Sequence, residues 1–222
     1  MQVGADEAGK GPVLGSMFAA AVRAPEAALP GGLRDSKELT ARRREELDDR
    51  LRGSDRVEIG LAEVTTGRID DPGTDMNTLT VAVQADALRA VAREADTAYL
   101  DAGDVDADRF GRRVGGRLGV DTDIRAEHGA DARHPIVAAA SVVAKVARDA
   151  HVTELAAEYG AVGSGYPSDP TTRSFLESYV SEHDGLPDCA RASWTTSEDA
   201  LAANGIVEDG SGEKDQSTLG EF

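Results

Sequence analysis

Cysteine is almost absent from this sequence, and Cys189 is its only example. A single cysteine excludes an internal disulfide and a metal site built from several thiolates, so we expect Cys189 to be a small buried apolar residue. The sequence also lacks an apolar run of about 18 residues and a basic segment followed by an apolar one, which argues against a membrane-spanning helix and a secretory leader. These absences predict a cytoplasmic protein that uses no membrane.

Lysine is scarce as well, with four residues in a chain of 222, of which Lys10, Lys37 and Lys145 lie in segments that other patterns single out. Asp and Glu number 41 against 24 Lys and Arg, giving a formal net charge of −17. Taken alone, that charge argues against a nucleic-acid partner. An acid-rich, lysine-poor surface also suits a halophilic cytoplasm, because at about 1 M salt the Debye length is only roughly 3 Å. Net charge therefore excludes no partner here.

The length fits one domain, able to bury about 70% of the surface that the unfolded chain exposes. We expect this domain to span residues 1–205, with a helical C-terminal part from about residue 160. In residues 206–222 the composition shifts to Gly, Ser, Glu and Asp, which have too little apolar surface to fold. The sequence therefore predicts one domain followed by a flexible acidic tail.

Two neighbouring carboxylates, Asp6 and Glu7, stand near the end of a short apolar run and before a tight turn at residues 9–12. Neighbouring side chains of a strand point to opposite faces of a sheet, so the two acids can share one site only if the strand ends about there. Like charges this close repel unless a cation lies near, and hard divalent metals prefer carboxylate oxygens. The pattern fits either a metal site or a solvated strand end.

Apolar periodicity along the rest of the chain predicts strands interleaved with helices. After the opening strand, further strands are expected at 14–22, 57–64, 97–101 and 120–126, and helices at 41–52, 78–95, 103–118, 136–159, 171–183 and 197–204. Thr40 is placed to cap the first of these helices, and Pro135 stands at the first turn of the longest.

Two further acids occur at the edges of expected elements. Asp101 ends the fourth strand, and Asp131 precedes the longest helix. If the first and fourth strands are neighbours, their ends converge. Three or four carboxylates would then form a site for two divalent metals about 3.5 to 4 Å apart, one activating the attacking water and one steadying the leaving oxygen of an in-line phosphoryl displacement.

The segment from Gly4 to Lys10 also has the spacing of a phosphate-binding P-loop, with Asp101 as its possible magnesium-side acid. The chemistry fits poorly, because Gly11 has no hydroxyl for magnesium and the two acids at 6 and 7 would face the phosphates of a nucleotide. A P-loop nucleotide hydrolase is therefore the alternative hypothesis.

Five motifs together resemble the ribonuclease HII family, in that family's order, over most of the stretch from Gln2 to Trp194. They are Gly4-Ala5-Asp6-Glu7-Ala8-Gly9-Lys10-Gly11-Pro12, Asp35-Ser36-Lys37, Tyr99-Leu100-Asp101, Ala130-Asp131 with the run from Ala138 to Asp149, and the run from Gly163 to Pro170. One motif would be weak, but five in order are highly specific. The resemblance implies an α/β fold of the ribonuclease H-like type, a mixed five-stranded sheet flanked by helices, with a helical C-terminal part.

The resemblance further implies an endonuclease of DNA replication and repair that acts as a monomer. It would cleave the RNA strand of RNA–DNA hybrids, and ribonucleotides embedded in duplex DNA, leaving 3′-hydroxyl and 5′-phosphate ends. Two divalent ions, Mg²⁺ or Mn²⁺, would be held by Asp6, Glu7, Asp101 and Asp131. Asp149 is the rival for the fourth place, although its position in a helix four residues after Lys145 favours a structural ion pair.

The same resemblance implies substrate contacts. The turn Gly9-Lys10-Gly11 matches the family's Gly-Arg/Lys-Gly turn, whose backbone could approach the ribose 2′-hydroxyl that distinguishes RNA from DNA. Tyr166 matches the tyrosine that packs against the sugar at the RNA-to-DNA junction, with a tyrosine wedged into the core as the alternative. Phosphate contacts are implied for Lys37, Lys145 and Arg148.

The tail carries a separate pattern, Gln216, Leu219 and Phe222, spaced Gln-x-x-Leu-x-x-Phe. It resembles the peptide that docks a sliding clamp, in which one helical turn sets an aliphatic and an aromatic side chain into a pocket. The usual second aromatic is missing, but a place after a flexible linker suits the motif. A sliding clamp is therefore an expected partner, and a non-catalytic protein that binds hybrid or clamp is a further alternative, against which the presence of all four acids argues.

Overall fold

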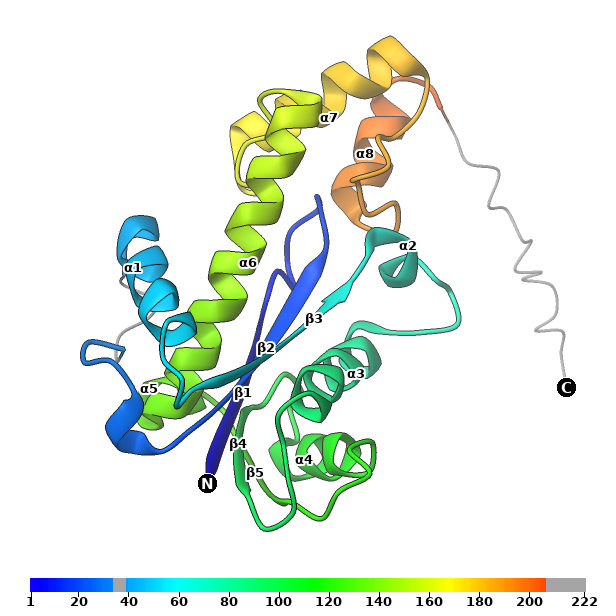
Figure 1. Cartoon of the computed structure of the whole chain (residues 1–222). Helices are drawn as coiled ribbons and strands as arrows, with labels where there is room; N and C mark the ends of the chain where they lie inside the picture. Colours follow the sequence, from blue (N-terminus) through cyan, green and yellow to red (C-terminus); the bar gives the residue numbers. More distant parts are fainter. Residues whose placement is uncertain (34–38, 207–222) are drawn as a thin grey trace, which may run out of the picture.

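The computed structural model describes residues 1–33 and 39–206, which form a five-stranded sheet with helices on both faces and a helical extension toward the C-terminus (Figure 1). The strands are β1 (Gln2–Ala8), β2 (Met17–Ala24), β3 (Glu58–Val64), β4 (Thr97–Asp101) and β5 (Asp123–Glu127). Their order across the sheet is β3-β2-β1-β4-β5. β2 runs antiparallel to β1 and to β3, whereas β4 is parallel to β1 and to β5. The expected mixed sheet is confirmed.

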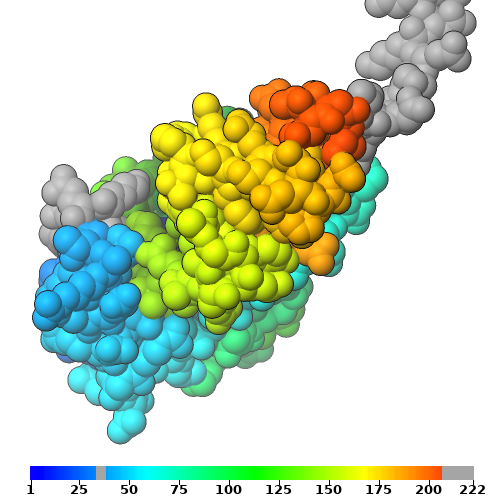
Figure 2. Space-filling model, turned by 90° about the horizontal axis from the view of Figure 1, so that it is seen from above, coloured from blue at the N-terminus to red at the C-terminus, as the bar shows by residue number. Residues whose placement is uncertain are grey.

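Helices cover both faces of this sheet. They are η1 (Glu26–Ala28), α1 (Ala41–Arg52), α2 (Thr66–Ile69), α3 (Met76–Arg89), α4 (Ala107–Gly115), α5 (Ala130–Arg133), α6 (Pro135–Tyr159), α7 (Pro170–His183) and α8 (Thr195–Ala203). α3 and α4 lie on one face, α1 and α6 on the other, and α7 and α8 pack beyond the sheet (Figure 1). From above, the blue α1 lies directly against the yellow-green α6 (Figure 2). No described helix is long and apolar enough to cross a bilayer.

Alternation along the central strands divides the apolar side chains between two cores. In β1, Val3 and Ala5 face the helices α3 and α4, whereas Gly4 faces α6. A third core holds the C-terminal part together and includes Leu155 of α6 and Leu176 of α7. The helical extension therefore has a core of its own, which the distal half of α6 and the chain at Val13 and Leu14 connect with the sheet layer.

α6 lies so close to β1 that only glycine fits at position 4. A Cβ on Gly4 would stand 2.4 Å from the backbone carbonyl carbon and oxygen of Ile136. The first half of α6, from Val137 to Ala144, is completely buried and consists of Ala, Val and one Ser. These small side chains let α6 pack closely on β1 and β2. The close packing fixes the position of β1, the strand that carries the acids.

Some predicted boundaries are wrong. The second strand begins at Met17 rather than at residue 14, because Leu14 leaves the sheet and forms an isolated bridge with Ala190. The helix expected at 78–95 starts at Met76 and ends at Arg89. The single-turn helices α2 and α5 were not expected, since one turn is too short to show a helical period. The Thr40 cap is confirmed, because its hydroxyl accepts a hydrogen bond from a backbone N–H in the first turn of α1.

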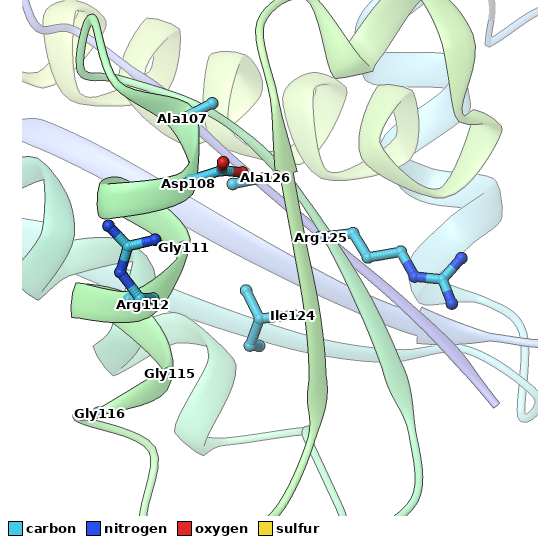
Figure 3. A pocket seen from close by; sticks show the side chains of 9 residues that line it. All are labelled: Ala107, Asp108, Gly111, Arg112, Gly115, Gly116, Ile124, Arg125 and Ala126. Carbon is cyan, nitrogen blue, oxygen red and sulfur yellow. The ribbon is translucent and has the colours of Figure 1, made fainter.

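A pocket of about 490 Å³ lies between α4 and the edge strand β5 (Figure 3). Gly111 and Gly115 of α4 allow the close approach, because a Cβ on either would stand 3.1 to 3.2 Å from Ala126 or Ile124. Arg125 points away from α4 (Figure 3), and its guanidinium carbon lies 5.8 Å from the ring centroid of Tyr99. None of the residues expected at the site lines this pocket, so the expected chemistry lies elsewhere.

Candidate active site

The strand β1 carries the first two acids, but it does not end at them. It continues to Ala8, which pairs with Phe18 of β2. The expectation that the strand ends about there is confirmed, because β1 stops one residue after Glu7, where Gly9 has a φ of 89°. By the alternation of β1, Asp6 points toward α6, where Ser141 lies near its carboxyl, and Glu7 points toward α3. The two acids thus enter the site from opposite faces of the sheet.

The strand β4 ends beside these acids. Parallel pairing of β1 with β4 stops at Ala5 and Leu100, so Asp101, the last residue of β4, follows at the position next to Asp6. Adjacent strands lie about 4.8 Å apart, and residues paired across a sheet share a face. Asp6 and Asp101 therefore stand side by side on the α6 face. The expected neighbourhood of the first and fourth strands is confirmed.

Gln84 connects Glu7 with the end of β4. Its side chain is completely buried, and its amide nitrogen donates to Glu7 Oε2 at 2.5 Å and to the carbonyl oxygen of Asp101 at 2.9 Å. Gly103 leaves room for the acid, because a Cβ there would stand 3.1 Å from Glu7 Oε1. Sequence reasoning missed Gln84, although an amide within the apolar face of a helix is a signal that could have found it.

The helix α5 brings Asp131 to the same end of β4. The backbone N–H of Ala130 donates to Asp101 Oδ1 at 2.9 Å, and Asp131, the next residue, is buried. Asp149 lies farther along α6, where its Oδ2 accepts a hydrogen bond of 2.6 Å from Arg44 of α1. Its carboxylate is thus held in an ion pair with a guanidinium of another helix, whereas the spacing suggests Lys145 as the partner.

Burial and mutual repulsion raise the pKa of both acids of β1. The pKa of Asp6 lies well above its usual range, because the carboxyl is desolvated and faces the charges of Glu7 and Asp101. Burial raises the pKa of Glu7 to about 7, although the hydrogen bond from Gln84 and the charge of Lys10 oppose the shift. A nearby cation would favour the charged forms of both acids.

These residues fit divalent metal ions by their chemistry. All the donors are carboxylates, whose oxygens suit Mg²⁺ and Mn²⁺, and the raised pKa values mark them as a cluster that a cation would stabilise. Within residues 1–33 and 39–206, no group of three or more His, Cys, Asp or Glu side chains already surrounds one metal position.

We expect the metal-free protein to lose stability as the pH rises from about 4.5 to about 7. The pKa of Glu7 is about 7 in the folded protein against an ordinary value of 4.5, so folding favours the protonated carboxyl. Its stabilising contribution is fully present below pH 4.5 and is lost as the pH rises through 7. Thermal melts in metal-free buffer at constant high salt should show the Tm of the wild type falling relative to that of Glu7→Gln across this window. A Tm difference that stays constant with pH would contradict the assignment.

The expected substrate turn leaves the sheet directly after β1. Lys10 Nζ donates to the carbonyl oxygen of Gly103 at 2.5 Å, which places the ammonium at the end of β4. A Cβ on Gly11 would stand 3.7 Å from the ring of Tyr166, so the turn and the tyrosine form one surface. Tyr166 is 39% exposed, and the alternative of a tyrosine wedged into the core is therefore wrong.

Arg148 packs against the ring of Tyr166. Its guanidinium carbon lies 4.9 Å from the ring centroid, and its Nη2 donates to the carbonyl oxygen of Ser164. Arg148 also lines a cleft of about 610 Å³ beside α1 and α6. Lys145 lies half-buried on the same helix. The remaining predicted contacts, Lys37, Gln216, Leu219 and Phe222, lie outside the described residues.

Sequence reasoning also missed Arg191, which is completely buried beneath the substrate turn. Its guanidinium donates to the carbonyl oxygens of Gly9, Lys10 and Gly15 at 2.6, 3.0 and 2.9 Å. A lone arginine close to the only tryptophan of the chain is a weak signal, and nothing local in the sequence indicates its partners.

Comparison with known proteins gives consistent results. The family model described as ribonuclease HII matches residues 3–197. A ribonuclease HII of Halobacterium salinarum is 62% identical over 220 residues, covering 99% of this chain and 98% of the relative. The crystal structure of the ribonuclease H2 from Pyrococcus horikoshii OT3 superimposes with a TM-score of 0.84 at 35% identity, covering 91% of this chain and 98% of that one.

A second solved structure is that of the PCNA:RNase HII complex from Archaeoglobus fulgidus. It is similar with a TM-score of 0.81 at 34% identity, covering 90% of this chain and 96% of that one. The similarity thus includes the sheet, the helices on both faces and the helical extension.

Proposed function

This chain belongs to the ribonuclease HII family of endonucleases that act on RNA–DNA hybrids, and from that premise we propose that four carboxylates around the ends of β1 and β4 perform its hydrolysis. They are Asp6, Glu7, Asp101 and Asp131. The observation that carries this proposal is the placement of Asp6 beside Asp101, where pairing between β1 and β4 stops. The P-loop alternative is excluded, because Gly4 to Ala8 are strand residues of β1 rather than a loop around a phosphate.

Two divalent ions, Mg²⁺ or Mn²⁺, would be held by these carboxylates and would supply Lewis acidity at the attacking water and at the leaving oxygen. The chain's own residues set the orientation of the acids. The Ala130 N–H fixes one oxygen of Asp101, and the Gln84 amide fixes one oxygen of Glu7. The Lys10 ammonium favours the charged form of Glu7. Both acids of β1 therefore become better ligands once a cation offsets their burial.

We propose that the turn at residues 9–11 and Tyr166 read the ribose, which would let the enzyme cut at ribonucleotides embedded in duplex DNA. Support comes from their shared surface and from the exposure of the Tyr166 ring. The cleft beside α1 and α6 suits a phosphate backbone, because Arg148 lines it and Lys145 lies on the same helix. Lys37 is assigned to the same backbone on its motif alone.

The experiment that tests this function uses a duplex with one ribonucleotide, incubated with Mg²⁺ or Mn²⁺ at high salt. We expect a single cut on the strand that carries the ribonucleotide. A polymerase should extend the new 3′ end and a ligase should accept the new 5′ end, as a 3′-hydroxyl and a 5′-phosphate require. An all-DNA duplex of the same sequence is the control. Binding of the duplex without cleavage would instead favour the non-catalytic alternative.

We propose that a sliding clamp binds the tail through Gln216, Leu219 and Phe222. The Archaeoglobus relative, whose structure is that of a complex with PCNA, supports this partner. Deleting residues 216–222 should abolish clamp binding in a pull-down or by surface plasmon resonance, because both pocket-filling side chains are lost. Ser217→Ala is the matched control, since this residue lies between the motif positions. Clamp affinity that survives the deletion would refute the assignment, and hydrolysis without clamp should be unchanged in both variants.

We further infer a monomer that works in a saline cytoplasm in DNA replication and repair. The acidic composition and the haloarchaeal relative support the saline setting. Because counterion release weakens phosphate binding as salt rises, such an enzyme depends more on shape, metals and the 2′-hydroxyl than on charge.

A further inference from the structure

Two segments far apart in the sequence are joined beside the substrate turn. Gly15 N–H donates to the carbonyl oxygen of Cys189 at 2.7 Å, and Arg191 N–H donates to that of Val13 at 2.8 Å. An isolated bridge connects Leu14 with the same strand-like stretch. The segment between α7 and α8 is therefore bonded directly to the chain that leaves β1, so the helical extension and the turn form one unit.

The Arg191 side chain occupies this junction without a carboxylate partner among the described residues. All three of its hydrogen bonds go to backbone oxygens, those of Gly9, Lys10 and Gly15. Burying a guanidinium is costly unless its donors are satisfied, and here burial lowers the pKa of Arg191 to about 10. A planar fork of donors that serves three carbonyls fixes their directions in a way that a single ammonium cannot.

Trp194 completes this support. Its ring centroid lies 4.9 Å from the guanidinium carbon of Arg191, and its indole N–H donates to the carbonyl oxygen of Gly11 at 3.3 Å. The carbonyls of residues 9, 10 and 11 therefore all point inward. In a trans peptide the following N–H points the opposite way, so the N–H groups of Lys10 and Gly11 are directed outward. Pro12 has no N–H, so the N–H groups of Lys10 and Gly11 are the two that this turn directs outward.

We propose that Arg191 and Trp194 are positioning residues that hold the turn with its two N–H groups aimed at the ribose 2′-hydroxyl, and thereby set the preference for RNA over DNA. This inference rests on the proposed function, which assigns the turn to the ribose. The outward groups lie beside Tyr166, because Gly11 borders its ring. A turn that could rotate its peptides would still bind phosphate but would lose the directional contact with the hydroxyl.

The test measures kcat and KM on a duplex with one ribonucleotide, and the inhibition constant Ki of the matching all-DNA duplex. The ratio of Ki to KM reports discrimination. Trp194→Phe keeps a ring against Arg191 and removes one donor, so we expect KM to rise about fivefold, with kcat within about twofold and Ki unchanged. Arg191→Lys removes the fork and should lower the ratio about tenfold or more. Arg89→Lys is the matched control, because Arg89 also donates to a backbone carbonyl, that of Arg117, and touches none of the residues of the turn.

The outcomes distinguish the assignment of the turn to the ribose from the positioning role of Arg191 and Trp194. A wild-type ratio near one would overturn the assignment of the turn to the ribose, and this inference with it. A wild-type preference that both variants retain would overturn only the positioning role, even if their Tm values fall, because a purely structural contribution moves stability without moving the ratio. Should Arg191→Lys fail to fold, Trp194→Phe alone decides by the same ratio.

Discussion

Asp6→Asn should abolish hydrolysis and at the same time make the metal-free protein more stable. The loss of activity follows because one of the two central carboxylates disappears, and metal assistance of several kcal/mol corresponds to a fall of about 10³-fold in kcat. The gain in stability follows because the buried Asp6 carboxylate repels Glu7 and Asp101. Relief of that repulsion should add about 1 kcal/mol to the free energy of unfolding.

Single-turnover cleavage of a duplex with one ribonucleotide measures the first effect, and thermal melts at pH 8 in metal-free buffer measure the second. Asp149→Asn is the matched control, since it makes the same chemical change on α6. It should retain cleavage within a few fold and lose some stability, because Arg44 loses its partner. Asp131→Asn should lose cleavage as Asp6→Asn does. Retained cleavage in Asp6→Asn, or the reverse order for Asp131 and Asp149, would refute the assignment of the four acids.

Gly4→Ala should destabilise the protein by about 3 kcal/mol, because the added methyl group has no room. The new Cβ would stand 2.4 Å from the backbone carbonyl of Ile136, and a helix backbone cannot yield as the end of a side chain can. The helix α6 or the strand β1 must then shift, so the position of Asp6 two residues later changes with it. We therefore expect cleavage to fall as well.

Urea unfolding at constant high salt measures this change as a lower midpoint. Gly31→Ala is the control, because no atom lies within 4 Å of a Cβ built at Gly31. Its midpoint should stay within error of the wild type, or rise slightly because alanine restricts the unfolded chain. Equal midpoints for Gly4→Ala and the wild type would show that α6 does not lie against β1 as closely as described.

The sequence predicted the strands, most of the helices and the pairing of β1 with β4, because these depend on local apolar patterns and on motif order. It could not predict toward which face of the sheet each acid points. β1 pairs with β2 as far as Ala8 but with β4 only as far as Ala5, and this difference in length is a property of the assembled sheet. Asp6 and Glu7 therefore lie on opposite faces of the sheet, and both are near Asp101 at the end of β4.

The missed residues share a physical reason. Gln84 and Arg191 are polar side chains inside apolar surroundings, and each donates hydrogen bonds to groups from a distant part of the chain. The local sequence does not indicate the partners of such residues. In a sequence pattern they therefore look like misplaced polar residues in a helix or a loop. Tyr166 was found only because its motif is specific, and its exposure depends on Arg148 and the neighbouring turn.

The hydrogen bond from Arg191 to Gly9 spans 182 positions of the chain. During synthesis at about 5 to 20 residues per second, the acid-bearing strands therefore leave the ribosome well before the arginine does. Until then the turn beside Tyr166 has no inward anchor for its carbonyls. Under the proposed role of the turn, a nascent or C-terminally clipped polypeptide would carry the carboxylates without the groups that hold the turn toward the ribose, and the order of translation would delay recognition of the sugar until the last part of the fold has formed.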